Sequence, residues 1–353
     1  MNRELHFTQK LLAWHRNDNK RIMPWKGEKN AYKVWLSEII LQQTKVEQGL
    51  AYYLRFLETF PNLRDLAEAE EDEVLRLWQG LGYYSRARNL HFTAKEVQAK
   101  YGGIFPKSST ELIQLKGIGE YTAAAISSFV NKEPIAVVDG NVIRVLARYF
   151  RIQLPFDSAE GKNFFREKAN HLIDQQNPDL YNQAIMDFGA TICKPKNPDC
   201  AACPLMDSCL AKQDNLISEL PLKTKKVAIK KRYFIALYIE TSHGIALQKR
   251  EEEDIWKGLY QLPSFELKAF TKNLELQVNE ILKREFPAEH FKLIELGKMQ
   301  KQKLSHREIQ IVFVHLKSQN EQILSDSYIY TRNLAKFAFP KVFILYFQSK
   351  GII

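Results

Sequence analysis

The sequence lacks the features that mark membrane, secreted and disordered proteins. Its 353 residues contain no run of about eighteen apolar side chains, so no segment is predicted to span a membrane. The first residues carry mixed charge and no apolar stretch of the kind found in secretory signals. Internal repeats and low-complexity tracts are absent as well. These absences predict a globular chain that stays in the cytoplasm.

Cysteine is scarce, and all four cysteines lie between Cys193 and Cys209. A disulfide framework would spread its cysteines along the chain, so this clustering favours a metal ion or a cluster. The spacing Cys193-x6-Cys200-x2-Cys203-x5-Cys209 includes a single CxxC and no histidine. Zinc usually takes two CxxC knuckles or Cys/His pairs, whereas loops of unequal length can wrap an iron–sulfur cluster. Four buried free thiols are the remaining alternative, which the surrounding proline and charge disfavour.

The composition is that of an ordinary globular protein, with 45% hydrophobic and 26% charged residues. The length suits two or three domains. The formal net charge is +10 and the isoelectric point is about 9.2. A basic protein of this kind most often binds a polyanion, and nucleic acid is the commonest one. Extra lysines that only keep the surface hydrated would give the same balance.

Apolar residues recur at three- and four-residue spacing through the first two-thirds of the chain, which predicts helices. The predicted helices cover residues 34–48, 70–79, 87–100, 121–130, 141–150 and 161–175. After about residue 225 the pattern changes to short alternating runs at 233–240, 244–250 and 308–316, which predict strands, the first two joined as a hairpin. Helices are expected near 274–286 and at the C-terminus.

The change of pattern divides the chain into three parts. We predict a helical domain over 1–215, a linker over 216–232 and an α+β domain over 233–353. The linker assignment rests on a basic, proline-marked stretch. A solvated strand edge is the alternative interpretation of that stretch.

The segment LIQLKGIGEYTAAAI at 112–126 predicts two helices joined by a tight hairpin. Gly117 and Gly119 permit the turn, because glycine tolerates backbone angles that other residues avoid. Amides of the hairpin and of the following helix N-terminus can hold a phosphate without reading a base. An ordinary turn in a helical bundle is the alternative. The flanking leucines, the small-residue helix and the basic charge, including Lys116, favour a DNA contact.

Two carboxylates stand out by their context. Asp139 precedes a predicted helix, where aspartate commonly accepts backbone N–H bonds, a role that Asn141 can share. Glu38 has Val34 and Trp35 at helical spacing, so it borders an apolar face. Burial there would raise the pKa of Glu38 and make it a candidate general acid near neutral pH. A lone glutamate on a helix is otherwise usually solvated.

Three motifs together resemble the endonuclease III superfamily of helix-hairpin-helix DNA glycosylases. They are the cysteine spacing, the hairpin followed by residues 137–144, and the block 35–44. The block 35–44 is similar to the MutY-type adenine branch in particular. The resemblance extends from about residue 11 to the C-terminus. It implies an all-α helix-hairpin-helix glycosylase domain with an iron–sulfur loop at 193–209, one 4Fe–4S cluster held by the four cysteines, and an α+β Nudix-like C-terminal domain.

The resemblance also implies a reaction: hydrolysis of the N-glycosidic bond of adenine mispaired with 8-oxoguanine or guanine, after the base is flipped out of the duplex. Glu38 would protonate a ring nitrogen of adenine. Asp139 would stabilise the sugar cation or bond it transiently, with Tyr121 shielding it and Asn141 completing the catalytic set. Bifunctional relatives carry a lysine at the position of Tyr121. A monofunctional enzyme with no or negligible lyase activity is therefore expected.

Further residues are implied by similarity to MutY segments. Gln43 and Tyr83 are expected to insert at the lesion, and of Tyr83 and Tyr84 one is expected to be a core aromatic. The adenine pocket is expected to contain Trp25, Lys26, Leu41 and Gln183. Lys26 stands where the family has arginine, which replaces a bidentate fork by a point charge. The other expected DNA contacts are Gln42, Thr44, Arg86, Lys116, Gly117, Gly119, Ser305 and His306.

In the C-terminal region, residues 256–263 resemble the tryptophan-containing strand of Nudix-type folds. The Nudix carboxylate signature does not follow, because Arg284-Glu285 continues as Phe286-Pro287. Magnesium-dependent hydrolysis is thus not expected, and the resemblance implies a domain that checks for 8-oxoguanine. Ser305 and His306 are expected to hydrogen-bond the oxidised base.

Two other hypotheses remain. One is a glycosylase/lyase for oxidised pyrimidines, which the missing hairpin lysine and the extra C-terminal domain disfavour. The other is a cluster-bearing DNA-binding or redox-sensing protein without base release, which Glu38 together with Asp139 disfavours. The resemblance implies duplex DNA as the partner, a monomer, and a place at the nucleoid in the cytoplasm.

Overall fold

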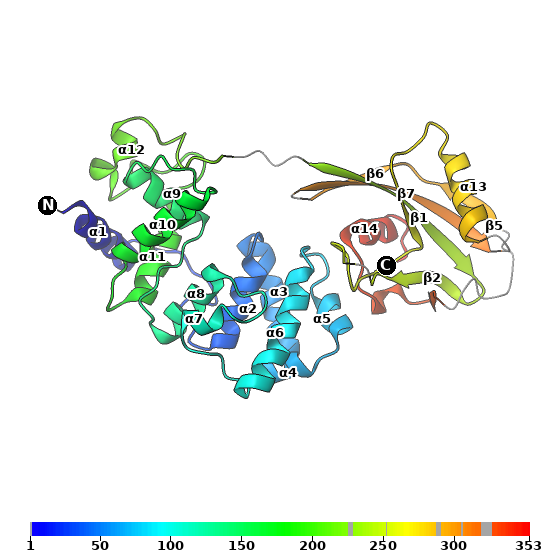
Figure 1. Cartoon of the computed structure of the whole chain (residues 1–353), viewed down its shortest axis with the longest axis horizontal. Helices are drawn as coiled ribbons and strands as arrows, with labels where there is room; N and C mark the ends of the chain where they lie inside the picture. The colour runs from blue at the N-terminus through cyan, green and yellow to red at the C-terminus, as the bar shows by residue number, and fades with distance from the viewer. Residues whose placement is uncertain (1, 225–228, 252, 287–290, 305, 319–326) are drawn as a thin grey trace. The chain divides into compact units, whose positions relative to one another are not determined.

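The computed structural model describes residues 2–224, 229–251, 253–286, 291–304, 306–318 and 327–353 (Figure 1). The chain divides into two compact units. The first contains Met1–Glu68 and Asn89–Lys226, and the second contains Ala69–Arg88 and Val227–Ile353. The prediction of a helical domain over 1–215 placed Ala69–Arg88 in the first part, whereas their contacts group them with the second unit.

The first unit is helical. Its helices are α1 (Arg3–Asn17), α2 (Ala31–Leu41), α3 (Val46–Thr59), α4 (Leu63–Glu68), most of α6 (Ser85–Tyr101), α7 (Ser109–Leu112), α8 (Glu120–Asn131), α9 (Gly140–Tyr149), α10 (Ala159–Leu172), α11 (Pro178–Thr191) and α12 (Leu210–Gln213), with a 3-10 turn at Met206–Ser208. Among the described residues, no strand precedes Lys230, as predicted. No helix in the described part of the chain is long and apolar enough to cross a membrane.

The prediction of one helix over 34–48 is wrong. The helix α2 ends at Leu41 and α3 begins at Val46. Between them Gln43 adopts a φ of +55°, in the left-handed region that ends a helix. No glycine or proline marks this break, and the helical spacing of apolar residues continues across it, so the sequence predicted a single helix. Helices α1 and α11 were not predicted.

The core of this part of the unit lies between α1, α9 and α11. Phe7 and Leu11 of α1 pack with Leu146 of α9 and Phe188 of α11, and all four are buried. The helices approach closely where α11 carries Gly189, because a Cβ there would lie 2.6 Å from the Cβ of Asn141. This packing fixes the start of α9 against α11, where several predicted site residues lie.

The second unit contains a mixed sheet with strand order β3-β2-β1-β7-β5. Its strands are β1 (Lys230–Thr241), β2 (Gly244–Lys249), β3 (Tyr260–Gln261), β4 (Ser264–Leu267), β5 (Phe291–Leu296), β6 (Gln300–Lys303), β7 (Arg307–Ser318) and β8 (Ile329–Thr331). The central pair β1 and β7 is parallel, while β4 pairs antiparallel with β1 and β6 with β7. The predicted β1–β2 hairpin is confirmed, with Thr241 opposite Gly244.

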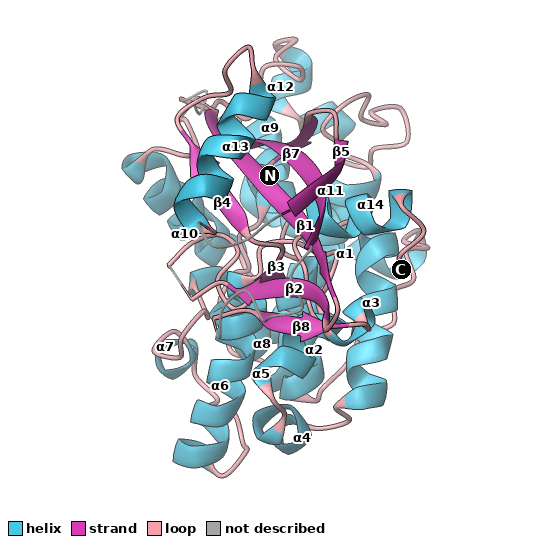
Figure 2. Cartoon of the chain, turned by 90° about the vertical axis from the view of Figure 1, so that its right-hand side faces the viewer, coloured by secondary structure: helices cyan, strands magenta, loops and turns pink. Residues whose placement is uncertain are grey.

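A helix covers each face of the sheet. On one face lies α13 (Leu274–Glu285), as Figure 2 shows. Its Val278 and Ile281 pack against buried strand residues such as Leu237 and Val314. On the other, the rings of Phe313 in β7 and Tyr346 in α14 (Lys341–Ser349) stack with centroids 4.0 Å apart. Because both faces are covered, the central strands are buried in their middle stretches.

Helix α5 (Glu71–Leu77) also belongs to the second unit. Its Asp72 carboxylate receives the Lys249 ammonium at 2.6 Å and the Tyr260 hydroxyl at 2.8 Å. Further along, the Tyr84 hydroxyl donates to the Phe339 carbonyl at 3.0 Å. These contacts explain why Ala69–Arg88 group with the sheet.

Candidate active site

A pocket of about 670 Å³ opens in the first unit. It is bordered by α2, the loops on either side of α2, α8, the start of α9 and α11. The pocket is lined by residues from three predicted groups. They are the catalytic residues Glu38, Tyr121, Asp139 and Asn141, the adenine-pocket residues Trp25, Lys26, Leu41 and Gln183, and the DNA contacts Gln42, Gln43 and Thr44. Segments distant in sequence thus converge on one cavity.

Glu38 lies on α2, whose first turn is capped by the Asn30 side chain. It is only 7% exposed, as its apolar helical neighbours led us to expect. Burial raises the pKa of Glu38 to about 7, and the charge of Asp139 adds to the effect. The Tyr121 hydroxyl donates to Glu38 Oε2 at 2.6 Å and partly opposes the rise. The group is thus poised to give or take a proton near neutral pH.

Asp139 caps α9, as predicted. Its Oδ1 accepts the backbone N–H groups of Asn141 and Val142, each at 2.8 Å, and its Oδ2 accepts the Asn141 side-chain amide at 2.7 Å. Burial raises the pKa of Asp139, and these hydrogen bonds oppose the shift. The cap therefore holds a carboxylate in a fixed orientation at the pocket wall, where it can stabilise positive charge.

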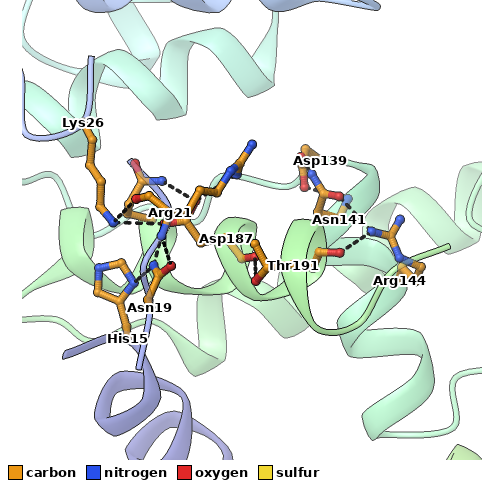
Figure 3. Close-up of polar contacts among 11 residues, drawn as sticks. His15, Asn19, Arg21, Lys26, Asp139, Asn141, Arg144, Asp187 and Thr191 are labelled. Carbon is orange, nitrogen blue, oxygen red and sulfur yellow. Dashed lines mark hydrogen bonds and ion pairs between the residues drawn. The ribbon is translucent and has the colours of Figure 1, made fainter. Parts of the chain in front are cut away.

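Arg144 ties the Asp139 cap to the cysteine loop. Its guanidinium donates to Asn141 Oδ1 at 2.8 Å and to the Gly189 carbonyl at 2.7 Å, while its Nε donates to the Cys193 carbonyl at 2.7 Å. Figure 3 shows Asp139, Asn141 and Arg144 along the start of α9. Helix α9 thus carries a pocket carboxylate at its N-terminus and contacts the beginning of the cysteine loop one turn later.

A second buried carboxylate, Asp187 of α11, was missed by the sequence analysis. It is 0% exposed and receives side-chain donors from Asn19, Arg21, Lys26 and Gln183 (Figure 3). Arg21, Lys26 and Gln183 line the pocket, so this cluster forms part of its wall. The sequence feature that could have indicated this buried carboxylate is an aspartate inside the otherwise apolar run at 185–188. Its partners lie more than 160 residues away in sequence, apart from Gln183.

Gln43 and Tyr83 share a backbone property. Their φ angles are +55° and +49°, in the left-handed region that non-glycine residues rarely adopt. Such strain often marks functional positions. Tyr83 lies in the second unit and is 43% exposed, whereas Tyr84 is buried, so the prediction that one of the two is a core aromatic is confirmed. The Arg86 guanidinium lies 5.5 Å from the Tyr83 ring centroid.

The predicted hairpin is present, formed by α7, a turn and α8. Gly117 has a φ of +79°, and Gly119 is the N-cap of α8. The turn is braced by Thr93, whose hydroxyl donates to the Lys116 carbonyl, and the Lys116 ammonium lies 4.4 Å from the Phe92 ring centroid. The hairpin amides thus lie at the start of the helix that carries Tyr121.

Of the predicted C-terminal contacts, Ser305 lies outside the described residues. His306 precedes β7, and its carbonyl accepts the Lys230 N–H at 3.1 Å. Its side-chain role stays a prediction.

The four cysteines are half-buried, and Cys193, Cys203 and Cys209 pack against the α1, α9 and α11 core. Burial raises the pKa of Cys203 to about 12. A guanidinium nitrogen of Arg148 lies 3.5 Å from the sulfur of Cys193 and provides positive charge for a thiolate there. In the described part of the chain, no three metal-binding side chains converge tightly enough for a single ion. With a single CxxC and no histidine, the spacing of the four cysteines fits a cluster better than mononuclear zinc.

Comparison with known families agrees with this geometry. Residues 36–173 match the model of the HhH-GPD superfamily base excision DNA repair protein, and residues 193–209 match the iron–sulfur binding domain of endonuclease III. The helical fold, the hairpin and the pocket thus define a base excision DNA glycosylase, an enzyme that cleaves N-glycosyl bonds. Its cofactor is one 4Fe–4S cluster.

Curated relatives narrow the class. An adenine DNA glycosylase of Buchnera aphidicola subsp. Baizongia pistaciae is 39% identical over 262 residues, which cover 74% of each chain. An adenine DNA glycosylase of Homo sapiens is 41% identical over 216 residues, covering 59% of this chain and 39% of that one. The chain belongs to the adenine DNA glycosylase family.

Solved structures support the fold over about 60% of the chain. A thermostable thymine-DNA glycosylase matches with a TM-score of 0.56 at 26% identity, over 60% of this chain and 97% of that one. A trapped endonuclease III–DNA covalent intermediate matches with a TM-score of 0.52 at 21% identity, over 61% and 100% of the two chains. The second similarity concerns the fold alone.

Proposed function

We propose that this enzyme hydrolyses the N-glycosidic bond of adenine mispaired with 8-oxoguanine or guanine in duplex DNA, after the base is flipped out of the helix. The observation that carries the proposal is the juxtaposition of Glu38, Tyr121 and Asp139 in one pocket of a chain from the adenine DNA glycosylase family. Adenine is a poor leaving group unless it is protonated, and the pKa of Glu38, about 7, suits a proton donor at neutral pH.

The reaction follows from these groups. Neutral Glu38 donates its proton to a ring nitrogen of adenine as the bond between the base and C1′ breaks. Positive charge develops on the sugar, and the Asp139 carboxylate stabilises it. The Glu38 carboxylate then accepts a proton from the water that attacks C1′. Tyr121 orients Glu38 through its hydrogen bond and shields the sugar, and Asn141 holds the Asp139 carboxylate.

The proposed enzyme is monofunctional. A lyase needs an unprotonated amine that attacks the sugar, and Tyr121 replaces the lysine of bifunctional relatives. Two lysines line the pocket, and each is ion-paired: Lys26 with Asp187 at 3.2 Å and Lys29 with Asp179 at 2.8 Å.

The lesion-facing roles are also proposals. Gln42, Gln43, Thr44, Tyr83 and Arg86 would contact the distorted duplex. The hairpin formed by Lys116, Gly117 and Gly119 would hold a backbone phosphate. The chain would act as a monomer at the nucleoid in the cytoplasm.

The second unit is proposed to check the opposite base. A mixed sheet covered by one helix on each face is compatible with a Nudix-like domain over 233–353. The linker is proposed at 216–232, as predicted from the sequence, but β1 already begins at Lys230. The Nudix carboxylate signature is absent from the sequence, so recognition rather than hydrolysis is proposed. Ser305 and His306 would hydrogen-bond 8-oxoguanine.

The four cysteines are the proposed ligands of the cluster. Bound there, the cluster would join the loop at 193–209 to the end of the helical core. Arg148 would remain beside Cys193 and balance thiolate charge.

Base release from end-labelled duplexes tests the proposal. The duplexes carry adenine opposite 8-oxoguanine, adenine opposite guanine, thymine opposite guanine, or thymine glycol opposite adenine, and each is analysed with and without alkali. We expect adenine loss with strand breaks only after alkali. Cleavage of thymine glycol without alkali would identify a lyase for oxidised pyrimidines, and DNA binding without base release would support a non-enzymatic role.

A further inference from the structure

The Asp187 carboxylate is saturated with donors. Its Oδ1 accepts from Arg21 at 2.9 Å and from Gln183 Nε2 at 3.0 Å. Its Oδ2 accepts from Asn19 at 2.8 Å and from Lys26 at 3.2 Å. A carboxylate offers about four lone-pair positions, and all are used here. The two cations also balance the buried charge, so the carboxylate is fixed in orientation.

This arrangement determines how the Gln183 amide is turned. The two ends of a glutamine amide differ only in hydrogen-bonding sense, and their orientation follows from the partners. Because ionised Asp187 only accepts hydrogen bonds, Gln183 presents Nε2 to it. The Oε1 is then directed away from Asp187, on a side chain that lines the pocket. Among the described residues, nothing donates to this oxygen.

We propose that Asp187 is a positioning residue that selects the base: by holding Gln183 Nε2, it leaves Gln183 Oε1 as an acceptor for the exocyclic 6-amino group of a flipped purine. A 6-oxo purine such as hypoxanthine presents a carbonyl oxygen at that position, which meets Oε1 without a proton between them. The inference rests on the proposed adenine substrate and adds the reason why a 6-oxo purine is rejected.

The test compares excision of adenine and of hypoxanthine opposite the same base, under single-turnover conditions. The quantity measured is the ratio of the two rates. Asp187→Asn is nearly isosteric but presents both an oxygen and an amide, so it no longer dictates the orientation of Gln183. We expect the ratio to fall by about tenfold relative to the wild type. Intrinsic differences between the two glycosidic bonds cancel, because the ratio is compared between variants.

Two further variants separate positioning from a general structural role. Gln183→Met removes the amide, so Asp187→Asn added to it should change the ratio no further. Asn19→Ala removes a donor from Oδ2 and leaves both partners of Oδ1, so this variant should keep the wild-type ratio even where its thermal stability falls.

The outcomes are distinct. An equal loss of both rates in folded Asp187→Asn would show that Asp187 is structural and would overturn the inference. If Asp187→Asn does not fold, the Gln183→Met variant provides the test. An adenine-to-hypoxanthine rate ratio that is unchanged in Gln183→Met overturns the inference as well. A wild-type enzyme that releases no adenine from any duplex would instead refute the proposed function.

Discussion

Each unit buries a carboxylate, yet the two carboxylates have opposite acid–base properties. Glu38 in the first unit is buried as a whole residue, whereas Asp254 in the second is half-buried, with its side chain 8% exposed. Glu38 is hydrogen-bonded by the neutral Tyr121 hydroxyl, and burial raises its pKa to about 7. Burial acts on Asp254 in the same direction, but guanidinium nitrogens of Arg232 and Arg250, each at 2.8 Å, lower its pKa below the ordinary value. A buried carboxyl is thus a proton donor only where cations are kept away.

Glu38→Gln should have the largest effect, because it removes both the proton donor and the base that follows. We expect adenine release to fall by about 10⁴-fold, near the upper end for acid–base catalysis. Single-turnover assays on adenine opposite 8-oxoguanine measure the loss. The substitution removes a buried ionisable group, so thermal stability at pH 8 should not fall. Full activity in this variant would refute the role of Glu38.

Asp139→Asn keeps the size of the side chain and removes its charge. The positive charge on the sugar would then be unopposed, and the rate should fall by about 10²–10³-fold. Duplex affinity, measured with an uncleavable analogue of adenine, serves as the control and should change little. A rate within a factor of two of the wild type would mean that Asp139 only caps α9.

The sequence predicted the burial of Glu38 but not the charged partners that lower the pKa of Asp254. Val34 and Trp35 at helical spacing indicated that Glu38 is buried, because local periodicity reports which face of a helix packs. Arg250 and Gln183 each lie four residues before the carboxylate they contact, but the other donors come from distant segments, so no local pattern reveals the full sets around Asp254 and Asp187. The break after Leu41 was missed for a similar reason: its left-handed Gln43 is not marked by glycine or proline.

The fold shows the same division between local and distant information. The hairpin of β1 and β2 and the helix α13 were predicted from short-range patterns. The parallel pairing of β1 with β7 joins strands far apart in sequence, and the grouping of Ala69–Arg88 with the sheet depends on contacts such as that of Asp72 with Lys249. Only the folded chain reveals such pairings.

Tyr121→Phe should sharpen the comparison by removing the hydrogen bond that lowers the pKa of Glu38. In the wild type, the step that needs protonated Glu38 should slow by about tenfold per pH unit above pH 7. Without the phenol, the pKa of Glu38 rises, so the decline should begin at higher pH. Single-turnover rates between pH 5 and 9 measure the midpoint. A midpoint that stays in place or moves to lower pH would contradict this account.

Asp254→Asn tests the other side of the comparison through stability. Arg232 and Arg250 would lose a buried anionic partner, and we expect the second unit to lose about 1–3 kcal/mol at pH 7. Because the folded pKa of Asp254 is lowered, its contribution is present above the unfolded pKa and is lost as pH falls through the folded value. The gap between wild type and variant should therefore shrink in acid.

Hydrogen exchange of the β1 amides in the intact chain measures this local stability. Glu266→Gln is the matched control, because Glu266 also pairs with Arg232, at 2.6 Å, yet its side chain is 45% exposed. Solvent screens such a pair, so its removal should cost less than about 1 kcal/mol. Equal losses of stability in the two variants would show that burial does not strengthen the ion pairs of Asp254. The difference in pKa between Asp254 and Glu38 would then depend on their charged partners alone.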